Sequence, residues 1–170
     1  MFKKLMCLMA VLVFVSACDS TPDENASGGP GGNGSNSANI GGHKGNTVPG
    51  SKDDFVVNVG DRVFFEFNSS ELTTEARATL DRQAKWLKTY GDKSVMVEGH
   101  CDERGTREYN IALGERRATA AKNYLVAEGI SASRVRTISY GKERPAVLGH
   151  NEEAWAQNRR AVTAPEGPGT

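Results

Sequence analysis

Four residues with reactive or charged side chains stand side by side from His100 to Glu103, within the stretch EGHCDERGTREYN. Imidazole, thiol and carboxylate groups are common zinc ligands, and they also serve as the nucleophiles and bases of thiol enzymes. The cluster therefore raises two catalytic hypotheses, a metal centre and an active thiol. A third hypothesis is a charged turn that holds a ligand without changing it.

The metal and thiol hypotheses are both disfavoured by the sequence. Neighbouring residues of an extended segment point to opposite sides, so these four side chains cannot all converge on one ion. A zinc deaminase would need a P-C-x-x-C motif downstream, and the chain has none. A thiol enzyme built on Cys101 needs a base, and His100 would face away from it. A small structural thiol is favoured for Cys101, and we expect neither a metal nor another cofactor.

A ligand-holding role rests on Asp102 and Arg117. Arg117 follows Asp102 by fifteen residues, in a helix that we expect to start near Asn110. Arg117 would lie about two turns into this helix, and two turns span about 10 Å. Its guanidinium could therefore lie near the carboxylate of Asp102, with room for a ligand between them. A carboxylate can pair with an ammonium group, and the planar guanidinium of an arginine can bind a carboxylate through two N–H donors. Asp102 and Arg117 together therefore suit a zwitterionic ligand. An Asp102–Arg117 salt bridge that only pins the loop is the alternative, and spacing does not separate the two.

The elements that position these residues are indicated by hydrophobic periodicity. Val63, Phe65 and Phe67 alternate on one side of a predicted strand. The following helix runs from an N-cap at Thr73 to a stop at Gly91. Further along, the sequence predicts a strand at KSVMVEG, a helix that ends at Gly129, a strand at SRVRTISYG, a short helix capped by Asn151, and a final strand at RRAVT.

This order of elements, β-α-β-α-β-α-β, predicts an α/β (α+β) two-layer sandwich with a mixed sheet and helices on one face. Pro165 and Pro168 should end the last strand early, which suggests a weak edge strand. The charge is balanced, with 21 Lys and Arg residues against 21 Asp and Glu residues. Such a balance argues against nucleic-acid binding, which needs a basic face.

The N-terminus predicts export and a lipid anchor. Lys3 and Lys4 precede an apolar run that is too short to span a bilayer, which is typical of a secretory signal at residues 1–17. The ending VSAC resembles a bacterial lipobox, which implies a diacylglycerol and an N-acyl chain on Cys18. Residues 18–54 then predict the lipidated terminus and a disordered, glycine-rich tether, residues 55–164 a single domain, and residues 165–170 a flexible tail.

Three longer stretches resemble the OmpA-like peptidoglycan-binding domain family: FFEFNSSEL, VEGHCDERGTREYNIALGERRA and ISYGKERPAVLGHNEEAWAQNRRAV. The resemblance implies a non-catalytic domain that grips the meso-diaminopimelate of the peptidoglycan stem peptide. It assigns the diaminopimelate contacts to Asp102 and Arg117, and further stem-peptide contacts to Phe67 and Asn68. Pocket-shaping residues are then Glu103, Arg104, Thr106, Asn110 and Leu113, with Asn158, Arg159 and Arg160 in a supporting role.

The resemblance also implies a setting for the protein. The acyl chains would hold it in the outer membrane, facing the periplasm, with TolB and TolA of the Tol system as partners in membrane integrity and in constriction at division. Asp19 resembles an inner-membrane retention signal, so retention there is the alternative. Two rival functions are a wall-peptide hydrolase that uses His100, Cys101 or Glu103, and a purely structural lipoprotein. If the assigned pocket is right, Asp102→Ala and Arg117→Ala should each abolish wall binding while the fold stays intact.

Overall fold

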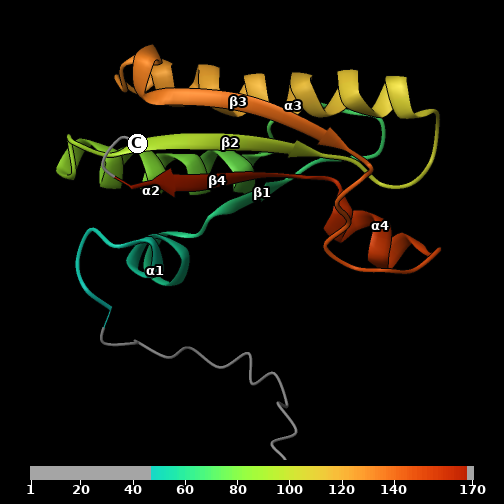
Figure 1. Ribbon diagram of the computed structural model, residues 1–170, viewed down its shortest axis with the longest axis horizontal. Helices are drawn as coiled ribbons and strands as arrows, with labels where there is room; N and C mark the ends of the chain where they lie inside the picture. Colours follow the sequence, from blue (N-terminus) through green and yellow to red (C-terminus); the bar gives the residue numbers. More distant parts are fainter. Residues whose placement is uncertain (1–46, 168–170) are drawn as a thin grey trace, which may run out of the picture. The chain divides into compact units, whose positions relative to one another are not determined.

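The computed structural model describes residues 47–167, which form a four-stranded sheet with helices around it (Figure 1). The elements are α1 (Lys52–Asp54), a π-helical turn (Phe55–Val59), β1 (Arg62–Phe64), α2 (Thr74–Thr89), β2 (Ser94–His100), α3 (Arg107–Ala127), a 3₁₀ turn (Ala132–Arg134), β3 (Val135–Gly141), α4 (Glu152–Asn158) and β4 (Arg160–Glu166). The strand order is β1-β4-β2-β3. β2 and β3 are parallel, whereas β4 is antiparallel to both of its neighbours. The predicted mixed α/β sheet is confirmed.

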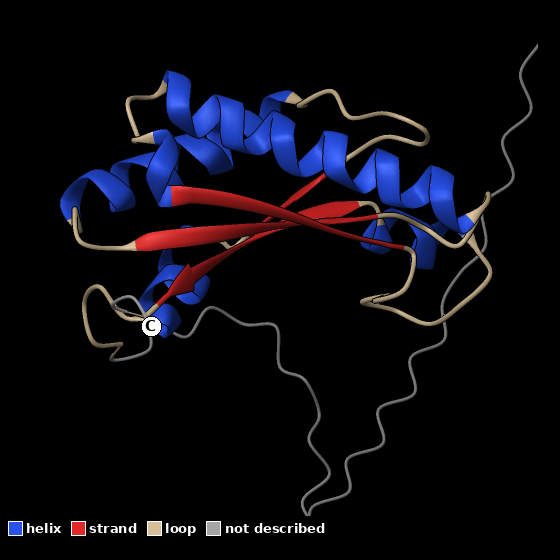
Figure 2. Cartoon of the chain, turned by 45° about the horizontal axis from the view of Figure 1, so that its top comes forward, coloured by secondary structure: helices blue, strands red, loops and turns tan. Residues whose placement is uncertain are grey.

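The long helices α2 and α3 cover the same face of the sheet, which gives two layers (Figure 2). Alternation along β2 points Val95 and Val97 toward the helices, and both are fully buried. Helical spacing brings Leu80 and Leu87 of α2 and Leu125 of α3 onto them, and these side chains are also fully buried. The core therefore lies between this sheet face and the two helices, as the periodicity predicted.

Two glycines allow α3 to pack directly against β2. A Cβ atom added at Gly99 would lie 1.8 Å from the carbonyl oxygen of Gly114, and one added at Gly114 would lie 2.3 Å from the hydroxyl of Ser139. No side chain fits at such distances, so both positions require glycine. This close approach fixes the height of α3 above the end of β2, where the loop carrying Asp102 begins.

Capping residues set the helix ends. The Thr73 side chain accepts a hydrogen bond from the backbone N–H of Ala76, which confirms the predicted start of α2. α3 begins at Arg107, three residues before the predicted start at Asn110, because the Thr106 side chain caps it by accepting from the N–H of Tyr109. Gly129 follows α3 with φ +92°, as expected of a glycine that ends a helix.

The first strand is shorter than predicted. β1 covers only Arg62–Phe64, and Phe65 is buried beyond its end. Phe67 was predicted on the same side as Val63 and Phe65, but its side chain is 58% exposed. The strand pattern fails there because the chain leaves the sheet after Phe65 and turns toward α2. Phe67 is thereby free to take part in a surface site.

The predicted edge strand is wrong, because β4 lies inside the sheet between β1 and β2. It also runs to Glu166, through Pro165, which pairs with Val95 of β2. The N–H of Thr163 donates to Asp61 on the β1 side, and the nitrogen two residues later faces the same way. β1 does not extend that far, so Pro165 costs the sheet no hydrogen bond.

Ordered structure begins before the predicted domain boundary. Asp54 closes α1, and its carboxylate accepts hydrogen bonds from the indole N–H of Trp86 at 2.8 Å and from the N–H of Gly50 at 2.9 Å. The segment predicted as a tether therefore overlaps described structure at residues 47–54. The predicted signal peptide, Cys18, Asp19 and Pro168 lie outside the described residues. Between residues 47 and 167 no helix combines the length and the apolar character needed to cross a membrane.

Candidate ligand-binding site

A cavity of about 240 Å³ opens where the β1–α2 loop meets the β2–α3 loop and the first turns of α3. Seven of the nine predicted binding residues line it: Phe67, Asn68, Asp102, Arg104, Asn110, Leu113 and Arg117. Gly105, Tyr109 and Cys101 complete the wall. The structure thus brings Asp102 and Arg117 to one cavity, as the ligand-holding hypothesis requires.

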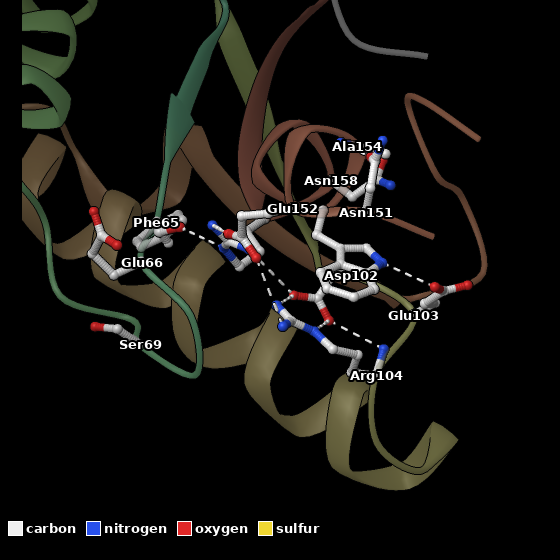
Figure 3. Close-up of polar contacts among 12 residues, drawn as sticks. Phe65, Glu66, Ser69, Asp102, Glu103, Arg104, Asn151, Glu152, Ala154 and Asn158 are labelled. Atoms are coloured by element: carbon white, nitrogen blue, oxygen red, sulfur yellow. Dashed lines mark hydrogen bonds and ion pairs between the residues drawn. The ribbon is translucent and has the colours of Figure 1, made fainter. Parts of the chain in front are cut away.

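Asp102 is held by two arginines from different parts of the chain. It is 4% exposed, and the Arg104 side chain donates to its oxygens from Nε at 3.2 Å and from Nη2 at 2.7 Å (Figure 3). Arg159 Nη1 lies 3.5 Å from Oδ2. Burial alone would raise the pKa of Asp102, but the hydrogen bonds from Arg104 and the charges of both arginines outweigh burial and lower that pKa. Asp102 is therefore a carboxylate at neutral pH.

Arg117 is fully buried, and backbone carbonyl groups hold its guanidinium. Nε donates to Ser69 at 2.8 Å, Nη1 to His100 at 2.9 Å and Nη2 to Glu66 at 3.1 Å. A guanidinium has five N–H groups, so two of them take part in none of these three bonds. Among the ion pairs of residues 47–167 none joins Arg117 to Asp102, which argues against a simple salt bridge between them.

The loop after β1 forms one side of the cavity. Asn68 is the one non-glycine residue with positive φ in the described chain, at +54°, a conformation that asparagine tolerates better than most residues. Its side-chain oxygen accepts a hydrogen bond from the hydroxyl of Tyr109 on α3. This contact joins the two sides of the cavity mouth.

Tyr109 was missed by the sequence reasoning, although its spacing offered a signal. Tyr109, Leu113 and Arg117 stand at positions i, i+4 and i+8 of α3, so they share one helix face. Since two of the three were already assigned to the site, the third could have been found. Gly105 also lines the cavity, and its φ of +92° turns the chain into α3.

Glu103 and Thr106 do not line the cavity. Glu103 points to the other side of the loop, where its carboxylate accepts hydrogen bonds from His150 at 2.7 Å and from the indole of Trp155 at 2.9 Å. Thr106 caps α3. Asn110 is buried and donates from its amide to the carbonyls of Arg104 and Thr106, which holds the loop in its turn.

The three residues predicted to support the site lie behind it. The Asn158 side chain bonds to the backbone of Ala146 and Val147 and so fixes the loop before α4. Arg159 is 5% exposed and donates to the carbonyl of Phe65 at 3.0 Å. Arg160 donates to backbone carbonyl groups only. Of the three, Arg159 alone contacts Asp102.

Cys101 has the surroundings of a structural thiol. It is 3% exposed, and its Sγ lies 3.3 Å from the carbonyl oxygen of Asn110, to which it donates. Burial raises the pKa of this thiol, which keeps it protonated and unreactive. His100 contacts Glu98 and Tyr140 instead of Cys101. Across residues 47–167 no group of three or more His, Cys, Asp or Glu side chains could hold a metal ion.

His100 should make the stability of the protein depend on pH. Its ring is 2% exposed, and neither nitrogen has a hydrogen-bond partner. Burial, followed by the charge of Arg160, lowers its pKa to about 4 from 6.5. The unfolded chain therefore binds more protons than the folded one between these values, so stability falls as pH drops from 6.5 to 4.

We expect His100 to cost about 2–3 kcal/mol of unfolding free energy across that pH window. Urea denaturation of the wild type and of His100→Phe at pH 4, 5 and 6.5 measures the loss, which should shrink in the variant. His150→Gln is the matched control, since the side chain of His150 is 86% exposed. Equal pH dependence in His100→Phe and the wild type would show that His100 does not titrate in this way.

The comparisons with known proteins agree with this fold. A model of the OmpA family matches residues 64–159, and the chain belongs to the OmpA family. The peptidoglycan-associated lipoprotein of Mesorhizobium japonicum is 46% identical over 166 residues, which cover 98% of this chain and 94% of that protein. The protein of that name from Rhizobium meliloti is 53% identical over 133 residues, 78% of this chain and 76% of its own length.

Solved structures support the same placement. The crystal structure of the peptidoglycan-associated lipoprotein from Burkholderia pseudomallei has a TM-score of 0.61 and 40% identity, and the match covers 62% of this chain and 90% of that one. The C-terminal domain of Helicobacter pylori MotB has a TM-score of 0.59 at 20% identity, over 63% of this chain and 84% of its own, and shares the fold alone. These relatives are not enzymes, and neither is this protein.

Proposed function

We propose that this protein is an outer-membrane lipoprotein that binds peptidoglycan non-covalently and so ties the outer membrane to the cell wall. Its ligand in this proposal is the meso-diaminopimelate of the stem peptide. The observation that carries the proposal is the cavity of about 240 Å³ that Asp102 and Arg117 both line. Its wall offers the carboxylate of Asp102 and, in Arg117, a guanidinium with two further N–H groups, which matches a zwitterionic amino-acid group.

The bound state follows from this arrangement of charges. The ammonium group of diaminopimelate pairs with Asp102, and its carboxylate accepts from the two remaining N–H groups of Arg117. Because Arg117 is already fixed by three backbone carbonyls, little conformational entropy is lost when it binds. The aromatic rings of Phe67 and Tyr109, 58% and 44% exposed, stand at the cavity and can pack against the stem peptide.

The lipid anchor and the tether complete the proposal. Acyl chains on Cys18, palmitate among them, hold the chain in the membrane, and the glycine-rich segment lets the domain reach the wall. Each attachment raises the local concentration for the other, so a modest affinity of the cavity suffices. TolB and TolA are the proposed partners, within the Tol-Pal system that maintains membrane integrity and acts in cell division. The relatives are named peptidoglycan-associated lipoproteins, which supports both the lipid anchor and the association with the wall.

Isolated cell walls of two chemical types test this function. Full-length protein should sediment with walls whose stem peptide carries meso-diaminopimelate, and far less with walls that carry lysine at that position. Lysine keeps the ammonium but lacks the second carboxylate, so Arg117 loses its partner. We expect at least about a tenfold difference in affinity, as for one charge-assisted hydrogen bond. Equal sedimentation with both walls would contradict the assignment of the ligand.

A further inference from the structure

The carboxylate of Asp102 is largely occupied in this structure, because Arg104 makes three hydrogen bonds to it. A carboxylate offers about four lone-pair positions. The backbone N–H of Arg104 takes one at 3.1 Å, and the Arg104 side chain takes two more through Nε and Nη2. Arg159 Nη1 faces Oδ2 from 3.5 Å. An incoming ammonium group must therefore compete with these donors for Asp102.

Arg104 is the donor that can leave. Its side chain is 31% exposed, whereas that of Arg159 is 6% exposed and is tied to the carbonyl of Phe65 at 3.0 Å. The Arg104 guanidinium lies between two aromatic rings, 4.1 Å from the centroid of Phe67 and 4.0 Å from that of Trp155. The rings keep it at the cavity without enclosing it, since cation–π contacts at exposed sites are weak.

A second carboxylate, that of Glu152, lies close enough to pair with Arg104. Glu152 of α4 lies 3.7 Å from Arg104 Nη1, and its side chain is 63% exposed (Figure 3). Glu152 also accepts a hydrogen bond from Arg159 Nη2 at 2.7 Å, which holds it in position. Arg104 thus lies between a buried carboxylate that belongs to the cavity and an exposed one outside it. Glu152 is therefore an acidic partner that Arg104 keeps if its side chain leaves Asp102.

We propose that Arg104 is an internal competitor of the ligand, whose guanidinium occupies Asp102 in the free protein and passes to Glu152 when the ligand's ammonium group binds. This inference rests on the proposed function, since it assumes that Asp102 receives an ammonium. The contact keeps a buried carboxylate paired while the cavity is empty. It also lowers the affinity, because the site binds only in the fraction of molecules in which Arg104 has moved. Attachment to the wall therefore remains exchangeable.

Replacing Arg104 tests the competition. The probe is a soluble muropeptide that carries meso-diaminopimelate, titrated calorimetrically into the full-length protein. Arg104→Met keeps an unbranched side chain between the rings and removes the guanidinium, and it should bind the muropeptide about five- to tenfold more tightly than the wild type. Arg104→Lys keeps the charge but loses the fork, and its affinity should lie between the two. Glu152→Gln should bind more weakly, because Arg104 then has no second carboxylate.

The controls separate competition from a general effect of charge. Arg107 is exposed, pairs with Glu143 and does not line the cavity, so Arg107→Met should stay within about twofold of the wild type at physiological salt. The gain from Arg104→Met should vanish in an Asp102→Asn background. If Arg104→Met binds as well as or less well than the wild type, the competition is refuted while the proposed function stands. If neither protein binds the muropeptide, both proposals fail.

Discussion

The Asp102→Asn variant is expected to bind a meso-diaminopimelate muropeptide at least about 30-fold more weakly than the wild type, a loss of about 2 kcal/mol or more. An amide has the shape of the carboxylate but no charge to offer an ammonium group. It also leaves Arg159, which is 5% exposed, without the carboxylate that it now faces at 3.5 Å. Isothermal titration of the full-length protein measures the affinity, and thermal unfolding in parallel shows how much of the loss is structural.

Glu103→Gln is the matched control for Asp102→Asn. It removes the adjacent carboxylate, which faces His150 and Trp155 outside the cavity. We expect its affinity for the muropeptide to stay near that of the wild type. An Asp102→Asn protein that is folded and binds normally would show that the ammonium group is held elsewhere, and the zwitterion model would then fail.

The Arg117→Met variant is expected to lose about 3–5 kcal/mol of unfolding free energy, since one buried and two partly buried carbonyl groups lose their donor at up to about 1–3 kcal/mol each. This expectation replaces the one from sequence, in which Arg117→Ala removed binding and spared the fold. The side chain is 0% exposed and connects the β1–α2 loop to the end of β2. Urea denaturation followed by tryptophan fluorescence measures the change.

Arg116→Met is the control for this variant, because its side chain leaves α3 one residue earlier and is exposed, with its guanidinium 6.0 Å from the centroid of the Tyr109 ring. It should unfold within about 0.5 kcal/mol of the wild type. Arg117→Met would change the shape of the cavity and also remove a group that binds the ligand. A loss of wall binding in this variant would therefore not by itself prove direct contact between Arg117 and the ligand. An Arg117→Met protein as stable as the wild type would mean that the three carbonyls find other donors.

The ends of the helices were predictable because residues close in sequence determine them. Thr73 and Gly129 act within one turn of the helix that they start or end, so a single sequence carries the signal. The place of β4 was not predictable in this way. Its two neighbours, β1 and β2, lie far from it in sequence, and only their pairing shows why Pro165 is tolerated in an interior strand.

The candidate site was predicted in outline through the family resemblance. Spacing and resemblance brought Asp102 and Arg117 together, and the cavity agrees with this pairing. The side chains that contact Asp102 and Arg117 could not be predicted from the sequence. Asp102 pairs with Arg104 two residues away and with Arg159 from the far end of the domain, and no local pattern distinguishes these arginines from the exposed Arg107 or Arg116.

The interior place of β4 has a consequence for the order in which the protein can assemble. β1 pairs with no strand of the described chain except β4, and β4 is also the strand that joins β1 to β2. Until residues 160–166 have been synthesised, the first and second strands cannot belong to one sheet. Because β1 pairs with residues as distant in sequence as Val162, the complete sheet can form only after the whole domain has been synthesised. In the proposed function the chain is exported, and it would then reach the translocation machinery before its sheet is complete.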